Sequence, residues 1–268
     1  MPTAIPDFVG RENELARLHD ALEAEERPVV VVHGEPGIGK TRLAREFARR
    51  AGTDVLWGTC DPGRVGSPYA PWAEALGGRA DPRDYDAVAA ALDGGPAVVL
   101  DDLQWASAET IELLVHVARF APAPLIVVLH RGSEIESAPL AAIARRRECL
   151  YIGLESLSPD EAVVLVEGAA ESRVGPDVLD AIYAESGGNP FFAQELARQL
   201  RREDPAGRPP VTVRRAIGLR LAELSEPARA MLQLAAVFEQ GFGFRELERR
   251  SGARAPRDHE AIRRVRRQ

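Results

Sequence analysis

Residues 34–41, GEPGIGKT, limit the fold of this chain more than any other feature of its sequence. They fit the pattern G-x-x-x-x-G-K-[ST], in which a glycine-rich loop turns its N–H groups toward phosphates. The β-branched run 28–33 before the loop predicts a strand, and residues 41–51 after it have apolar side chains at helical spacing. A strand, this loop and a helix in that order predict a phosphate-binding loop within an α/β fold.

Each residue type in the loop has a physical role. Glycines let the backbone curl, and the following helix directs its positive end at the same anion. Lys40 is the only lysine beside 33 arginines, and it supplies a compact cation for the β- and γ-phosphates. Thr41 offers a hydroxyl to Mg²⁺. The predicted nucleotide contacts here are Gly34, Gly37, Ile38, Gly39, Lys40, Thr41 and Arg42.

A second motif is the run 96–102, PAVVLDD, in which four apolar residues end in two acids. Open α/β sheets bind ligands at the carboxyl ends of their strands. We expect Asp101 to hold Mg²⁺ through water, and Asp102 to orient or deprotonate an attacking water. The alternative is that Asp102 only caps the next turn. The full phosphate loop upstream favours the catalytic interpretation.

A third element is Arg131, directly after the predicted strand 125–130. An arginine at that strand end can sense a γ-phosphate and assist catalysis, whereas the alternative is an exposed loop arginine. The neighbouring His130 is interpreted as a packed residue at the end of the strand.

The distribution of apolar runs predicts the fold class. Further strands are expected over 54–57, 97–101 and 149–153, with a helix over 108–120. Strands that are apolar throughout indicate burial on both faces, and therefore a parallel sheet of five strands in a three-layer αβα core over residues 1–154. Ser158, Pro159 and Glu161 then give a helix start that opens a helical lid with its linker, residues 155–210. The start of a winged-helix-like segment is expected over 211–268.

Composition excludes several classes of protein. Apolar residues make up 45% and charged residues 28%, as in ordinary globular chains. We expect no membrane span and no signal peptide, and two distant cysteines, Cys60 and Cys149, predict neither a disulfide framework nor a zinc site. A cytoplasmic location is therefore predicted.

The net charge of −7 is unevenly distributed along the chain. Residues 245–268 hold nine arginines and four acids, so that segment carries +5 and the first 244 residues carry −12. An acidic body is a poor default for binding nucleic acid, because affinity for DNA depends on neutralising phosphates. The basic end is interpreted as a solvated terminus, with an anionic partner as the alternative.

Taken together, several segments resemble the nucleotide-binding module of STAND-type ATPases in the AAA superfamily. The similarity is closest to the ATPase domain of large ATP-binding LuxR-type transcription regulators, and related modules occur fused to adenylate cyclase or kinase domains. The resemblance extends over residues 7 to 244. It is carried by FVGRENEL at 8–15, GEPGIGKTRL at 34–43, GTCDPGRVGSPYAPWAEAL at 58–76, LDDLQWA at 100–106, GGNPFFAQEL at 187–196 and IGLRLAELSEPARAMLQLAAVF at 217–238.

The resemblance implies roles that spacing alone does not supply. Val9, Gly10 and Arg11 would lie over the adenine, Pro190 of the G-x-P motif would pack on the base from the lid, and Arg131 would be the sensor. Such modules use ATP and ADP with Mg²⁺ as a switch: ADP holds a closed state, and exchange for ATP, aided by an unknown inducer, permits self-association. Slow ATP hydrolysis then resets the module, which implies an ATP-binding switch of a bacterial signalling or transcription regulator.

The chain departs from the family after residue 249, where RRSGARAPR interrupts the winged-helix pattern. We expect either a truncated or excised piece of a regulator or a stand-alone module, with DNA contacted only through a C-terminal domain absent from these residues. Two other readings remain open: an oligomeric AAA-type motor with fast turnover, and a remnant that only binds nucleotide. The motor needs an arginine finger, for which residues 145–147 are candidates; their alternative role is a solvated helix end.

Overall fold

The computed structural model describes residues 8–61, 68–121, 123–131 and 148–200. Within this part, one sheet has five strands in the order β2-β3-β4-β1-β5, and every neighbouring pair is parallel. This confirms the predicted fold class. The strands are β1 (Val29–Gly34), β2 (Val55–Thr59), β3 (Ala97–Asp101), β4 (Leu125–Arg131) and β5 (Cys149–Leu154).

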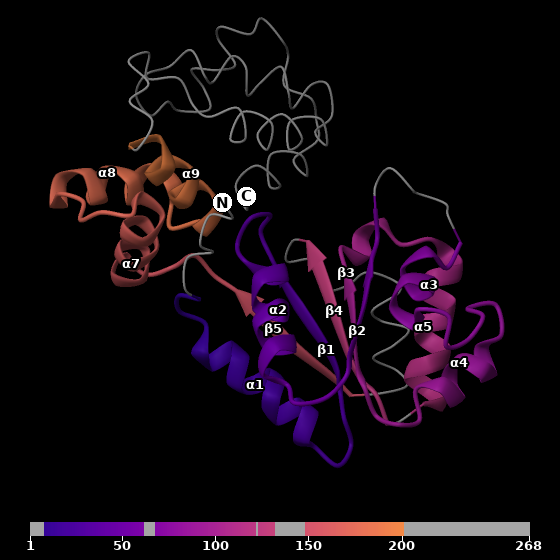
Figure 1. The fold of residues 1–268 in the computed structure, drawn as a ribbon. Coiled ribbons are helices and arrows are strands. Elements are labelled where there is room, and N and C mark those ends of the chain that lie inside the picture. Colours follow the sequence, from indigo (N-terminus) through magenta and orange to yellow (C-terminus); the bar gives the residue numbers. More distant parts are fainter. Residues whose placement is uncertain (1–7, 62–67, 122, 132–147, 201–268) are drawn as a thin grey trace, which may run out of the picture. The chain divides into compact units, whose positions relative to one another are not determined.

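Helices cover both faces of the sheet (Figure 1), which gives the three layers predicted from the sequence. Alternate residues of β1 belong to different layers: Val30 and Val32 pack in the core with α1 and α2, whereas Val29 and Val31 pack in the core with α3, α4 and α5. Strands that are apolar throughout are thus explained by burial on both faces. The helices are α1 (Glu12–Glu23), α2 (Lys40–Arg50), α3 (Ala70–Leu76), α4 (Tyr85–Ala91) and α5 (Ala108–Phe120).

The element boundaries differ from the sequence-based expectation by one or two residues. For example, β1 and β4 each end one residue later than predicted, because Gly34 and Arg131 still pair across the sheet. Helix α2 begins at Lys40 rather than Thr41. The ends of β1 and β4 therefore bring the phosphate loop and Arg131 to the same edge of the sheet.

Three further helices have a hydrophobic core of their own, which includes Leu165, Ile182 and Ala193. The first begins as the sequence predicts: the Ser158 hydroxyl accepts from the Glu161 N–H, and the Glu161 carboxylate accepts from the Ser158 N–H. The other two begin at prolines, Pro176 and Pro190. The helices are α7 (Pro159–Ala170), α8 (Pro176–Ser186) and α9 (Pro190–Leu200).

The chain divides into two compact units, residues 1–203 and 204–268. The second unit lies outside the described residues, as do residues 145–147. The predicted winged-helix segment, the linker and the arginine-finger candidates are therefore untested, and the boundaries at 154 and 210 stay predictions. Cys60 and Cys149, which the structure describes, are not disulfide-bonded.

Candidate functional site

The loop between β1 and α2 turns at glycines. Gly34, Gly37 and Gly39 have φ angles of 147°, 80° and 108°, which residues with side chains rarely adopt. A Cβ atom on Gly34 would lie 2.8 Å from the carbonyl oxygen of Leu154, so a side chain does not fit there. The glycines that the phosphate-loop pattern requires are thus needed for the local backbone shape.

Lys40, at the start of α2, lies within the loop that precedes it. Its side chain is buried, and Nζ donates hydrogen bonds of 2.9 Å to the carbonyl oxygens of Gly34 and Glu35. A buried ammonium requires such partners because removing it from water is costly. The chain's single lysine is thereby held inside the segment where the sequence places a phosphate.

Ile38 and Arg42 complete the loop residues predicted to contact nucleotide. The Ile38 side chain is 2% exposed and packs in the core formed with α1 and α2, so this residue can offer a ligand only its backbone. Arg42 is half-buried in the first turn of α2. These two residues lie beside Lys40, and their contacts with nucleotide stay predictions.

Thr41 and Asp101 come from α2 and the end of β3, and their side chains meet. The Thr41 Oγ1 donates to Asp101 Oδ2 over 3.0 Å. Burial raises the pKa of Asp101, and the charge of Asp102 adds to that rise, whereas the hydrogen bond from Thr41 opposes it. A hydroxyl and a carboxylate placed together offer the oxygen ligands that Mg²⁺ prefers. The structure therefore brings together the two residues predicted to hold the metal.

Asp102 follows β3 in the left-handed conformation, with φ 55°. Its Oδ1 accepts a hydrogen bond of 2.7 Å from Gln104 Nε2, and its side chain makes no capping bond to the short 3₁₀ helix Leu103–Trp105. Asp102 is the N-cap residue of that helix through its backbone carbonyl, which accepts from the Trp105 N–H over 3.0 Å, whereas its side chain takes no part in the cap. The catalytic role of Asp102 stays a prediction. Asp102 lies directly after the Mg²⁺-ligand candidate, as catalysis by a carboxylate at this edge requires.

Cys60 adjoins the two acids without adding charge to the site. Its N–H donates to the Asp101 carbonyl oxygen over 2.9 Å. Burial, followed by the charges of Asp102 and Asp101, raises the pKa of the Cys60 thiol to about 12. The thiol therefore stays protonated at neutral pH.

Arg131 is the last residue of β4, and its Cα pairs with that of Gly34 at the start of the phosphate loop. The backbone thus has the position that a sensor requires, while the side chain lies outside the described residues. His130 pairs with His33 on β1 and is half-buried. The sensor role of Arg131 stays a prediction.

The segment predicted to lie over the adenine joins the start of α1 to the helices after β5. Val9 packs against the core of α7, α8 and α9. Gly10 has φ 65°, and a Cβ there would lie against the Glu161 carboxylate, 2.9 Å from its Cδ. Arg11 donates to Glu14 Oε1 over 3.2 Å and to the carbonyl oxygen of Glu155. The segment is therefore fixed by both the sheet domain and the helices that follow it.

The turn before α9 reaches the phosphate loop directly, which the sequence analysis did not foresee. Asn189 Nδ2 donates to the Pro36 carbonyl oxygen over 3.1 Å, and the Phe191 N–H donates to the Gly37 carbonyl oxygen over 3.3 Å. Pro190, the predicted adenine contact, lies between these two residues. In the sequence, an asparagine before a helix indicates only a helix cap. The hydrogen bond from Asn189 to Pro36 joins residues 153 positions apart, so no local pattern predicts it.

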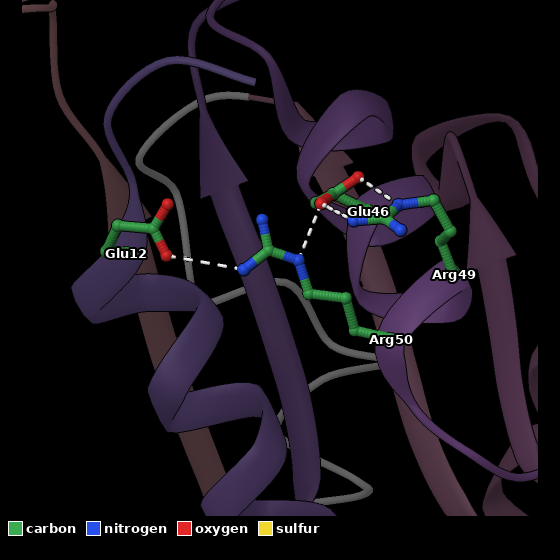
Figure 2. Close-up of polar contacts among 4 residues, drawn as sticks. All are labelled: Glu12, Glu46, Arg49 and Arg50. Carbon is green, nitrogen blue, oxygen red and sulfur yellow. Dashed lines mark hydrogen bonds and ion pairs between the residues drawn. The ribbon is translucent and has the colours of Figure 1, made fainter. Parts of the chain in front are cut away.

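Charged residues tie the phosphate-loop helix to α1 (Figure 2). Glu46 accepts hydrogen bonds from Arg49 at 2.7 Å and from Arg50 at 2.6 Å, and Arg50 also lies 3.5 Å from Glu12. The Arg50 guanidinium carbon lies 5.8 Å from the centre of the Phe8 ring. Arg50 thus links α2 with α1 and with the segment that leads into Val9.

We expect Glu46→Gln to lower the free energy of unfolding by about 0.5–1 kcal/mol at pH 7, as for other exposed ion pairs. The hydrogen bond from Arg49, with that from Arg50, lowers the pKa of Glu46 from 4.5 to about 2. A lowered pKa means that the stabilisation is present above pH 4.5 and is lost as the pH falls toward 2. Urea unfolding between pH 7 and pH 2 measures this, with exposed Glu25→Gln as the control. A difference between wild type and variant that does not shrink at low pH would contradict the assignment.

Residues 7–96 match the family model of the AAA ATPase domain. The RuvB subunit of the Holliday junction branch migration complex from Kosmotoga olearia is 24% identical over 226 residues, which cover 75% of this chain and 60% of RuvB. The chain thus spans less than two thirds of the length of the curated relatives it matches.

Solved structures with a TM-score above 0.5 show a similar fold. The Thermotoga maritima RuvB branch migration motor aligns with a TM-score of 0.55 and 22% identity, over 94% of this chain and 85% of RuvB. Aeropyrum pernix ORC1, solved in complex with DNA, aligns with a TM-score of 0.58 and 21% identity, over 98% of this chain and 82% of the ORC1 chain. A STAND protein with a tetratricopeptide repeat sensor from Pyrococcus horikoshii aligns with a TM-score of 0.48 and 18% identity, over 97% of this chain and 39% of the STAND chain. The narrower resemblance to LuxR-type regulators stays a prediction.

Within the described residues, no helix is long and apolar enough to cross a bilayer, and no three His, Cys, Asp or Glu side chains cluster as metal ligands. The positive findings agree with one another. The family match contains the phosphate loop, and the parallel sheet has the P-loop NTPase-like arrangement of the RuvB and ORC1 neighbours. Residues 7–96 therefore match an AAA ATPase domain, and the described sheet has the fold of P-loop NTPases.

Proposed function

We propose that this chain binds ATP and ADP with Mg²⁺ at residues 34–41 and hydrolyses ATP slowly. The observation that carries the proposal is the convergence of Lys40, Thr41, Asp101 and Asp102 at the carboxyl edge of the sheet. The residues fit the ligand: a loop of positive-φ glycines and a buried ammonium suit phosphates, and the Thr41–Asp101 pair suits Mg²⁺.

Each side chain then has a defined task. Lys40 exchanges its bonds to the Gly34 and Glu35 carbonyls for phosphate oxygens, while the loop N–H groups hold the remaining negative charge. Thr41 and Asp101 hold and orient Mg²⁺, which when bound neutralises charge developing on the phosphates. Asp102, held by Gln104, accepts the proton of the attacking water. Arg131 senses the γ-phosphate from the end of β4.

Recognition of the base involves the segment before α1 and the turn before α9. Val9, Gly10 and Arg11 lie over the adenine, and Pro190 packs on it from the lid. Support comes from the contacts that already join these segments to one another and to the phosphate loop.

The proposed cellular role is that of a switch in a bacterial signalling or transcription regulator of the STAND type, in the cytoplasm. The organisation is a core over 1–154, a lid with its linker over 155–210 and a winged-helix segment over 211–268. ADP holds the lid closed, and ATP with an inducer permits self-association. Support comes from the resemblance of residues 7–244 and from the bonds between the lid and the phosphate loop.

A second candidate is an oligomeric AAA-type motor with fast turnover. It is favoured by the match to RuvB, whose structure is described as a branch migration motor. In this alternative, one of the arginines at 145–147 completes the site of a neighbouring copy. The two candidates differ in their turnover and in its dependence on protein concentration.

The test is the nucleotide content and ATP turnover of the purified protein. We expect bound ADP after denaturation and chromatography, and turnover slower than about one per minute, against about 10 s⁻¹ for a typical enzyme. Turnover should not change per molecule over a hundredfold dilution. Fast turnover that rises steeply with protein concentration would support the motor. Failure of the wild type to bind Mg·ATP or Mg·ADP in calorimetry would overturn nucleotide binding itself.

A further inference from the structure

The carbonyl groups of the phosphate loop have donors from two different sources. Gly34 and Glu35 accept from Lys40 Nζ, whereas Pro36 and Gly37 accept from Asn189 Nδ2 and the Phe191 N–H. A loop that turns its N–H groups toward an anion must turn carbonyls elsewhere, and carbonyls that are partly withdrawn from water, such as that of half-buried Pro36, need partners. The second half of the loop therefore obtains its partners from the turn before α9.

Asn189 is fixed in the orientation that this contact requires. It is 4% exposed, and both ends of its amide are used, because Oδ1 accepts from the Phe191 N–H over 3.1 Å. The fit is close as well: a Cβ atom on Gly37 would lie 2.8 Å from Phe191 Cβ and 3.1 Å from Asn189 Oδ1. The side chain cannot move away from the loop without losing both hydrogen bonds.

The turn that carries Asn189 is itself held in place. The Gly188 carbonyl accepts from the Leu157 N–H over 2.9 Å, and the Asn189 N–H donates to the Ser186 carbonyl over 3.0 Å. A Cβ on Gly188 would lie 2.6 Å from the Leu157 carbonyl oxygen. Movement of the loop at Pro36 and movement of the turn at Asn189 must therefore occur together.

We propose that Asn189 is a positioning residue: from the lid, it sets the phosphate-binding conformation of residues 34–39. Binding of phosphate to this loop is thereby coupled to docking of the turn 186–191 on the loop. This inference rests on the proposed nucleotide binding. Lys40 leaves the Gly34 and Glu35 carbonyls when it binds phosphate. The donors that then remain are the Ile38 N–H on the Glu35 carbonyl, within the loop, and Asn189 and Phe191 on the Pro36 and Gly37 carbonyls, from the lid. Coupling between the sites is reciprocal by thermodynamic necessity.

Asn189→Ser separates this role from helix capping. Serine is a good cap and can still accept from the Phe191 N–H, but it is too short to reach Pro36. The control is Glu167→Ala, which removes bonds to Arg173 and the Val174 N–H at the opposite end of α7. Pyrophosphate, which has no base, is the probe for the loop alone.

In calorimetry we expect Asn189→Ser to weaken binding of both pyrophosphate and Mg·ADP by the same factor, about tenfold, since the Pro36 carbonyl at this part-buried contact loses its donor from Asn189. The Glu167→Ala variant should bind both as the wild type does. A loss for Mg·ADP without a loss for pyrophosphate would assign Asn189 to the base and overturn the proposal. Unchanged affinity for both ligands would also overturn it.

Hydrogen exchange on the wild type tests the coupling without a variant, should Asn189→Ser not fold. We expect pyrophosphate to slow exchange at the Phe191 amide, because a fixed loop holds its Gly37 acceptor in place. Unchanged exchange at saturating pyrophosphate would overturn the coupling. Failure of the wild type to bind pyrophosphate and Mg·ADP would instead overturn the proposed function, and this inference with it.

Discussion

We expect Lys40→Met to bind Mg·ATP about 100-fold more weakly than the wild type, because it removes charge-assisted bonding to the phosphates worth about 1.5–3 kcal/mol in total. Methionine is chosen because it keeps most of the length and apolar contacts of the buried lysine stem. Calorimetric titration with Mg·ATP gives the affinity. Catalytic turnover should be lost in parallel.

The control for this variant comes from the same helix. Arg49 has a side chain that is 68% exposed and bonds to Glu46, so Arg49→Met removes a cation of α2 remote from the loop. It should leave the affinity for Mg·ATP within about twofold. Lys40→Met also deprives the Gly34 and Glu35 carbonyls of a donor, so its thermal unfolding must be compared with that of the wild type. A folded Lys40→Met protein with near-normal affinity would contradict the site.

The composition allows an independent measurement on the unmodified chain. Lys40 is the only lysine, so its ε-amine is the chain's only side-chain target for amine acylation. The amine is buried within the loop, and we expect Mg·ADP to slow its acetylation further by placing phosphates against it. Mass spectrometry of the peptide containing Lys40 reports this, and equal labelling with and without Mg·ADP would contradict contact with phosphate.

The parts of the fold that the sequence predicted are those with local signals. The strand, loop and helix around Lys40 are contiguous, and the Ser158–Glu161 capping box is a pattern of four residues. Helices α1 and α3 were not predicted because their caps are Arg11 and Tyr69, both at positive φ and without a side-chain capping bond. Helix α4 had a usable signal, since Asp84 caps it through the Ala87 N–H.

Strand order could not be predicted, for a different reason. Apolar runs identify strands, but which strands become neighbours depends on crossovers between distant segments. The placement of β1 between β4 and β5 is what puts Arg131 beside Gly34. The bond from Asn189 to Pro36 is likewise long-range. The sequence therefore supplied the chemical groups of the site, whereas its geometry depends on the tertiary fold.

Asp102→Asn should slow ATP hydrolysis by about 10²–10³-fold while leaving Mg·ATP binding nearly intact, because a general base contributes a factor of that order and an amide cannot accept the proton. Asparagine is the appropriate substitution, since it tolerates the left-handed backbone at φ 55° and keeps an oxygen for Gln104. Single-turnover hydrolysis with protein in excess measures the chemical step separately from product release.

The neighbouring acid provides the matched comparison, because Asp101 and Asp102 are given different tasks. Asp101→Asn retains an acceptor for Thr41 but loses the charge that attracts Mg²⁺, so its main defect should be weaker Mg²⁺-dependent binding of ATP. The pair of variants should therefore separate binding from chemistry. If Asp102→Asn hydrolysed bound ATP at the wild-type rate, or if both variants failed only in binding, Asp102 would not be the base. The water would then have to be activated by another residue at this edge of the sheet.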